Sequence, residues 1–87
     1  MELKAAKHWK INLRPEQVAW HMQRSRVGGR TFIAVRRQNE KHDELHLIAG
    51  LHAAFLKENG LERTSDIYWE GGPRAWNWLR IESILLE

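Results

Sequence analysis

The sequence predicts a small α/β domain, with a three-stranded mixed sheet, one βαβ crossover and C-terminal helices. First, 87 residues without a linker or repeat have the length of one domain. Second, a run of β-branched and aromatic residues stands between stretches with helical spacing of apolar residues. Third, the chain before that run is long enough for a parallel crossover. We therefore expect one domain over residues 1–87, with a strand-helix-strand-strand core over 1–50 and a helical cover over 51–87.

The first expected elements are a short strand and a longer helix. Glu2–Ala6 alternates briefly between polar and apolar residues, and a polar connection follows over residues 7–13. Pro15 suits the first helical position, where its missing N–H needs no partner. The helix that it opens has no breaker before Gly28-Gly29, which is a strong stop signal. Arg14 is an unusual residue for the N-cap of this helix.

The clearest strand is the Thr-Phe-Ile-Ala-Val-Arg segment at residues 31–36. Its apolar side chains occupy both parities, so we expect it to be buried on both faces of the sheet. The polar residues 38–43 predict a turn, and residues 45–48 predict another strand that ends at Gly50. An extended first segment would lie parallel to the strand at 31–36.

The C-terminal part predicts helices. Residues 51–59 have the spacing of a short helix, closed by Gly60, and residues 62–70 are expected to be irregular. Gly71-Gly72-Pro73 precedes a last predicted helix over 74–86. Its apolar face is wide, so we expect this helix to be well buried or to bind a partner.

Charge is divided unevenly along the chain. Residues 1–43 contain ten Lys and Arg against four acids, whereas residues 44–87 contain four against seven. A basic half predicts a surface that faces a polyanion such as nucleic acid. The alternative is a solvated charged face without a partner.

Composition excludes several classes of protein. The absence of cysteine rules out a disulfide framework, a thiolate metal site and a cysteine nucleophile. No apolar stretch approaches the roughly 20 residues that cross a bilayer, and no apolar leader is seen. We therefore expect a cytoplasmic protein without a membrane partner.

Glu2 and Lys4 are the residues that suggest chemistry first. On a strand, two residues of separation place both side chains on one face. A carboxylate can hold Mg²⁺, and an ammonium can stabilise the charge that develops on an attacked phosphate. The alternative is a solvated terminal strand.

Three segments together extend this observation. E-L-K-A-A, then L-R-P-E-Q-V-A-W at 13–20, then G-G-R-T-F-I-A-V-R at 28–36, resemble the second half of the PD-(D/E)XK nuclease core. The resemblance is to phage and replication-repair nucleases of the VRR-NUC and Holliday-junction-resolvase type. It implies a partial nuclease-like core, a Mg²⁺ or Mn²⁺ cofactor, and duplex or branched DNA as partner. It further implies that Glu2 is a metal ligand, Lys4 the catalytic lysine and Gln17 the helix glutamine that faces the site.

One feature of the family is missing from the sequence. The family carries an aspartate on a strand before E-x-K, and only one residue precedes Glu2 here. Three alternatives stay open: part of a longer nuclease, a half-domain completed by a second polypeptide or a dimer mate, or a nonhydrolytic scaffold. If the chain is encoded by a phage, its expected location is the host cytoplasm.

The sequence therefore predicts a metal-dependent DNA endonuclease or junction-resolvase-like protein, incomplete or dependent on a homo-oligomer or second chain. The alternative is a noncatalytic nucleic-acid-binding or assembly protein with the same fold. A protein that only blocks or scaffolds another protein is a third interpretation, based on the acidic second half with its tryptophans.

Basic residues predict how DNA would be held. They come from the connection after E-x-K, from the end of the long helix with its glycine turn, and from the end of the buried strand. The predicted nucleic-acid-binding residues are Lys7, Lys10, Arg24, Arg26, Arg30, Arg36 and Arg37. On one rim they would neutralise phosphates without reading base sequence. The alternative is that these side chains only cover helix and strand ends.

Two histidines and a tryptophan are further candidates. His21 falls on the Gln17 face of the predicted helix, where it could contact a phosphate or a metal-bound water. His46 falls in a strand and is expected to be structural or solvent-facing. Trp20 is expected to pack the helix against the sheet, with base stacking as the alternative.

Overall fold

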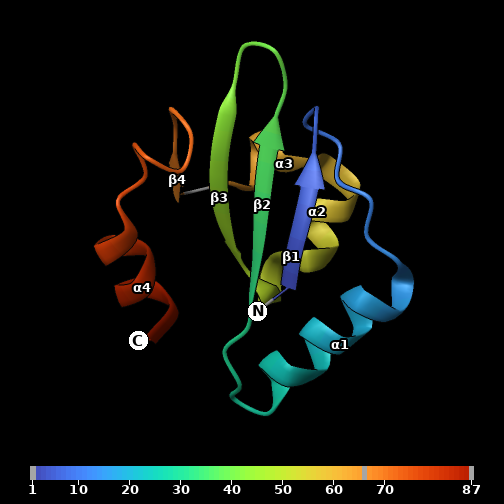
Figure 1. The fold of residues 1–87 in the computed structure, drawn as a ribbon. Helices are drawn as coiled ribbons and strands as arrows, with labels where there is room; N and C mark the ends of the chain where they lie inside the picture. The colour runs from blue at the N-terminus through green and yellow to red at the C-terminus, as the bar shows by residue number, and fades with distance from the viewer. Residues whose placement is uncertain (1, 66, 87) are drawn as a thin grey trace.

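A computed structural model of the chain describes residues 2–65 and 67–86, and of Glu2 it describes the backbone alone. The described residues form a mixed four-stranded sheet in the order β1-β2-β3-β4 (Figure 1). Its strands are β1 (Glu2–Ala6), β2 (Phe32–Gln38), β3 (Asp43–Ala49) and β4 (Ile67–Trp69). β1 runs parallel to β2, and the other neighbours are antiparallel. The predicted α/β class and the parallel first pair are confirmed.

Helices cover both faces of the sheet (Figure 1). They are α1 (Pro15–Arg26), the 3₁₀ turn η1 (Gly50–His52), α2 (Ala53–Asn59), α3 (Leu61–Thr64) and α4 (Trp78–Leu86). Ile33 and Val35 of β2 pack in a core with Leu56 of α2, whereas Ala34 packs in a second core with Ile81 of α4. Because successive strand residues point to opposite faces, β2 separates the two cores. Its predicted burial on both faces is confirmed.

Two predictions for the C-terminal part are wrong. Residues 67–69, expected to be irregular, form β4 against β3, so the sheet has four strands and not three. Residues 51–87 therefore contribute a strand to the sheet in addition to helices. The last helix begins at Trp78 because the segment before it is held in turns. There the Gly72 N–H donates to the carbonyl of Asp43 at 2.9 Å, and the Ala75 N–H to the carbonyl of Gly72 at 2.9 Å.

The ends of α1 follow the predicted signals. At its C-terminus, Gly28 has a φ of 80°, its N–H donates to the Ser25 carbonyl at 3.2 Å, and the Gly29 N–H donates to the Arg24 carbonyl at 2.8 Å. This is a Schellman motif, which favours glycine because of the positive φ. At the N-terminus Pro15 is the first helical residue, as expected.

Gly50→Ala is expected to destabilise the fold. A Cβ at this position would lie 1.8 Å from Thr31 Oγ1 and 2.7 Å from His21 Nδ1. These two atoms are hydrogen-bonded to each other at 2.7 Å. Overpacking of this kind costs about 1–3 kcal/mol of unfolding free energy, measurable by urea denaturation. Removal of the nearest atom in a Thr31→Ala/Gly50→Ala double variant should restore part of the loss. An unchanged urea midpoint in Gly50→Ala would contradict the packing described here.

Candidate active site and nucleic-acid interface

Lys4 and Gln17, predicted to share a site, are in contact. Lys4 lies in the middle of β1 beside Val35 of β2, and its Nζ donates to Gln17 Oε1 of α1 at 3.0 Å. The same oxygen accepts the backbone N–H of Arg14 at 2.9 Å. Gln17 therefore satisfies a free N–H at the start of α1 and also binds the strand lysine. This contact explains how the helix begins at an arginine N-cap.

Glu2 stands two residues before Lys4, with its backbone paired opposite Ile33. Its side chain, the predicted metal ligand, lies outside the described residues. Among the side chains that are described, no three His, Cys, Asp or Glu residues gather into a possible metal site. A Mg²⁺ ion takes about six ligands in an octahedral arrangement. The described residues therefore do not fit a complete site for Mg²⁺ or Mn²⁺.

β1 is the edge of the sheet on the side of the site. It stands at one end of the strand order, so within residues 2–65 and 67–86 only β2 pairs with it. Leu3, between Glu2 and Lys4, is 71% exposed. An edge strand of this kind presents backbone N–H and C=O groups that can pair with a further strand. A strand added there would lie beside Lys4.

Two predicted DNA-binding lysines line a hollow beside the connection from β1 to α1. Lys7, Lys10 and His8 from the connection meet Lys57 from α2 around a hollow of about 560 Å³. We call these four residues the basic hollow, and no carboxylate is among its described lining residues. Lys57 was not predicted from the sequence because it lies far along the chain from Lys7 and Lys10, in a helix without other signals of binding. Only the packing of α2 beside the connection brings it there.

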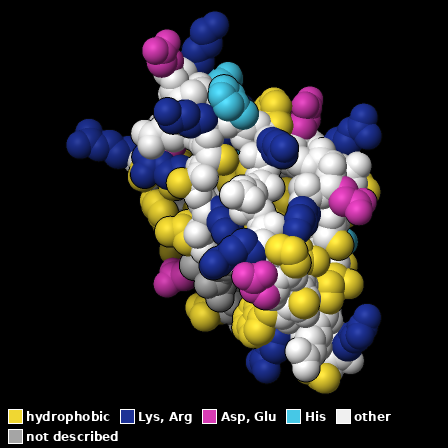
Figure 2. Space-filling model, turned by 90° about the vertical axis from the view of Figure 1, so that its right-hand side faces the viewer, with side chains coloured by type: hydrophobic (Ala, Val, Ile, Leu, Met, Phe, Trp, Pro, Cys, Tyr) yellow, Lys and Arg dark blue, Asp and Glu magenta, His cyan; other side chains and the backbone are white. Residues whose placement is uncertain are grey.

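The arginines of the glycine turn lie elsewhere. Arg24, Arg26 and Arg30 are exposed, and the Arg30 guanidinium lies 5.5 Å from the centre of the Phe32 ring. The turn after α1 lies at the opposite end of the sheet from the turn that follows β1 (Figure 1). Figure 2, which shows the right-hand side of Figure 1, has Lys and Arg side chains from top to bottom, with a few carboxylates between them. The exposed residues among those predicted to bind DNA therefore do not form a single rim. We call them together the basic face: Lys7, Lys10, Arg24, Arg26 and Arg30.

Arg36 and Arg37 differ from the other predicted basic residues because each forms a salt bridge with an acid of β3. Arg36 donates to both carboxylate oxygens of Asp43 at 2.9 and 2.7 Å, and Arg37 to both of Glu44 at 2.8 and 3.0 Å. As neighbours in β2 they point to opposite faces of the sheet. Arg37 is 5% exposed, and its guanidinium stacks 3.7 Å from the centre of the Trp9 ring. The prediction that Arg36 and Arg37 bind nucleic acid is therefore withdrawn, because each guanidinium is already bonded to a carboxylate.

Two other sequence expectations are corrected. His21 is fully buried, and its Nδ1 lies 2.7 Å from Thr31 Oγ1, so it cannot reach a phosphate. Trp20 was expected to pack on the sheet but is 49% exposed, with its ring edge-on to His21. The indole of Trp20 therefore lies partly on the outside of α1.

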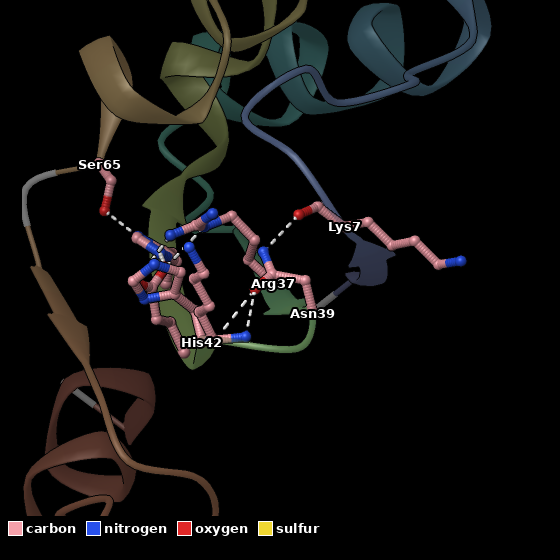
Figure 3. A network of polar contacts seen from close by, with 8 residues as sticks. Lys7, Arg37, Asn39, His42 and Ser65 are labelled. Carbon is pink, nitrogen blue, oxygen red and sulfur yellow. Dashed lines mark hydrogen bonds and ion pairs between the residues drawn. The ribbon is translucent and has the colours of Figure 1, made fainter.

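Sequence reasoning missed the polar network that extends from Glu44 (Figure 3). His46 Nε2 lies 2.9 Å from Glu44 Oε1, and His46 Nδ1 lies 2.5 Å from Ser65 Oγ. Burial lowers the pKa of His46, and its contact with Glu44 only partly offsets this. Burial would raise the pKa of Glu44, but the hydrogen bonds from Arg37 and His46 outweigh it, so this pKa lies below its ordinary value. At neutral pH Glu44 is charged and His46 is neutral.

Acidification is expected to destabilise the fold through this network. The pKa of His46 is 6.5 when unfolded and lower when folded, so stability is lost as pH falls from 6.5 through the folded pKa. The pKa of Glu44 falls from 4.5 on folding, which adds a further loss as pH falls below 4.5. Urea denaturation at a series of pH values checks this, with His46→Phe expected to remove the upper part of the dependence. A stability that is flat between neutral pH and about pH 5 would contradict it.

Within the described residues no helix has the length and apolar character needed to cross a membrane. Comparison of the chain with protein-family models, with curated proteins and with solved structures finds no match.

Proposed function

We propose that the chain binds DNA and carries part of the active site of a metal-dependent endonuclease of the junction-resolvase type. The observation that supports this most is the contact between Lys4 Nζ and Gln17 Oε1 at 3.0 Å. It joins two of the three site residues that the nuclease resemblance implies, and these two lie 13 residues apart in the chain. The parallel pairing of β1 with β2 across α1 is the topology that the same resemblance implies.

In this proposal Lys4 acts on the phosphate. Its ammonium, held at the exposed edge of the sheet by Gln17, would stabilise negative charge that develops as a phosphodiester is attacked. Gln17 fixes the position of the ammonium without neutralising it, because an amide oxygen accepts a hydrogen bond but carries no charge. Exposed Lys and Arg side chains of the basic face would hold the DNA backbone without reading its sequence.

The carboxylates that a Mg²⁺ or Mn²⁺ site needs would come in part from elsewhere. The described residues do not form such a site, and β1 has an open edge. We therefore propose that a strand of a second polypeptide or of a second copy pairs with β1 and supplies carboxylates beside Lys4. The pairing itself uses the backbone groups that edge strands present.

The test is a cleavage assay on duplex, flap and four-way DNA, with and without Mn²⁺. Lys4→Ala is expected to abolish cleavage, because no other described amine occupies its position on β1. Lys41→Ala is the matched control: it removes an exposed lysine from the turn between β2 and β3 and should leave cleavage unchanged. Gln17→Glu keeps the bond to the Arg14 N–H but adds a charge beside Lys4, so folding should persist while the rate falls. Cleavage by Lys4→Ala at the full rate would refute the assignment.

A noncatalytic DNA-binding protein is the second candidate. It is favoured by the exposed basic residues together with the lack of a metal site among the described side chains. This candidate predicts a shift of DNA in a gel without cleavage in Mn²⁺, also when the chain is concentrated enough to self-associate. The exposed ring of Trp20 would then add base stacking, so Trp20→Ala should weaken binding to single-stranded DNA more than to duplex.

A further inference from the structure

Ser65, His46 and Glu44 form a chain of hydrogen bonds around β3, on the same face of the sheet as Lys4 but two strands away from it. Ser65 Oγ lies 2.5 Å from His46 Nδ1, and His46 Nε2 lies 2.9 Å from Glu44 Oε1. His46 and Glu44 are two residues apart in β3 and so share a face, whereas Ser65 follows α3 directly. Figure 3 shows the Ser65 side chain pointing from the end of α3 toward this cluster.

The proton positions in this chain follow from its partners. A charged carboxylate only accepts hydrogen bonds, so the proton of the neutral imidazole is assigned to Nε2, facing Glu44. Nδ1 then carries the lone pair and accepts the hydroxyl proton of Ser65. Arg37 holds Glu44 in place through both of its oxygens. A serine hydroxyl, a neutral histidine base and an orienting carboxylate are the parts of an activated nucleophile.

The same three residues line a pocket of about 390 Å³. Tyr68 stacks on His46 with ring centres 5.1 Å apart, and Trp9 meets the same ring edge-on at 6.1 Å. Glu62 and Glu70 also line the pocket, while the one guanidinium among its described lining residues, that of Arg37, is bonded to Glu44. The aromatic walls favour a flat apolar group, and the carboxylates disfavour an anion. This pocket therefore suits an uncharged ester and not a phosphodiester.

We propose that Ser65 is a nucleophile with His46 as its general base and Glu44 as the positioning residue, and that the pocket accepts small uncharged esters. Ser65 Oγ would form a bond to the ester carbonyl carbon while its proton passes to His46 Nδ1. The bond from that carbon to the alcohol oxygen would then break, and the alcohol would leave with the proton from Nδ1. Water would then bond through its oxygen to the acyl carbon while one of its protons passes to His46 Nδ1. The bond from that carbon to Ser65 Oγ would break, the acid would leave, and the proton on Nδ1 would return to Oγ.

The other two serines serve as internal controls. Ser25 Oγ donates to the His21 carbonyl at 3.0 Å, and Ser83 is exposed on α4. In the full chain, a neutral fluorophosphonate probe should label Ser65 and neither control, as located by peptide mass spectrometry. General-base assistance is worth about 10²–10⁴ in rate, so we expect Ser65 to react at least 100-fold faster than Ser83. Equal labelling of the three serines, or no labelling of Ser65, would overturn the proposal.

Variants separate activation from structure. Ser65→Ala should lose the adduct and the hydrolysis of p-nitrophenyl acetate, whereas Ser83→Ala should keep both. His46→Gln should slow labelling of Ser65 about 100-fold in protein shown by circular dichroism to be folded. If His46→Gln does not fold, the pH profile of the wild-type chain decides. Labelling should rise with pH as His46 loses its proton and then level off, and a rate independent of pH would overturn the proposal.

The groups that face His46 shape this profile. They are Glu44 on β3, Arg37 on β2, Tyr68 on β4, Glu62 on α3, Glu70 after β4, and His42, whose Nδ1 lies 3.7 Å from Glu44 Oε2. Glu44→Gln keeps an acceptor for the histidine but removes the charge. A positioning role predicts that Glu44→Gln slows labelling and moves the midpoint of the profile, whereas unchanged values of both would remove Glu44 from the proposal. DNA binding through the basic hollow should be unaffected by Ser65→Ala.

Discussion

Arg37→Ala is expected to remove a large part of the free energy of unfolding, about 3–5 kcal/mol. The Arg37 and Glu44 side chains are 7% and 4% exposed, and the variant would leave the Glu44 carboxylate buried without its guanidinium. It would also remove the cation that stacks on Trp9. Single domains unfold with roughly 5–15 kcal/mol, so this variant should be marginally folded. Urea denaturation followed by tryptophan fluorescence measures the loss.

The matched control is Arg36→Ala, the next residue of the same strand. Arg36 binds Asp43 with a similar two-bond geometry, but its side chain is 38% exposed, so water can replace the lost partner. We expect a much smaller loss for this variant. The double variant Arg37→Met/Glu44→Gln should recover most of the stability, because no charge is buried and the introduced amide oxygen can still accept from His46. Equal losses for Arg36→Ala and Arg37→Ala would contradict the role of burial.

The contrast between the two arginines shows what local patterns can predict. The β-branched and aromatic run at 31–36, the polar turn over 38–43 and the apolar residues 45–48 are local signals, and they predicted the two strands of the β2–β3 hairpin to within two residues at each end. The exact register was not predicted, and register is what places Arg37 opposite Glu44. Without the register, two consecutive arginines at the end of a buried strand suggest a phosphate-binding site. Counting outward from the turn would have paired Arg37 with Glu44, whereas Arg36 stands opposite Leu45 and reaches Asp43 diagonally across the two strands.

The residues of the candidate sites also differ in whether the sequence alone could predict them. The nuclease resemblance assigned Lys4 and Gln17 to one site, and the structure places Lys4 Nζ 3.0 Å from Gln17 Oε1. Ser65 carried no sequence signature. It lies beside His46 at the end of α3, where its N–H donates to the Leu61 carbonyl, and α3 has just four residues, too few for a periodic pattern. Lys57 likewise depends on the packing of α2, which no pattern within the helix indicates.

Neutralising the basic hollow is expected to have the second large effect, on DNA affinity. Lys7→Gln, Lys10→Gln and Lys57→Gln together remove three of its charges and, if each meets one phosphate, make the slope of log affinity against log salt less steep by about 0.9 per contact. At low salt this corresponds to a loss of roughly 10²–10³-fold for duplex of any sequence. Fluorescence anisotropy over a salt series measures both quantities.

A control triple variant separates the hollow from net charge. Lys41→Gln, Arg74→Gln and Arg80→Gln change the net charge by the same amount at exposed positions that do not line the basic hollow. A bound backbone responds to charges within about one Debye length, roughly 10 Å at 0.1 M salt, so this control should lose little affinity. Arg24→Gln, Arg26→Gln and Arg30→Gln test the other end of the face in the same way. Equal losses for the hollow and control triples would mean that DNA responds to net charge alone, and the basic hollow would then have no role as a binding site.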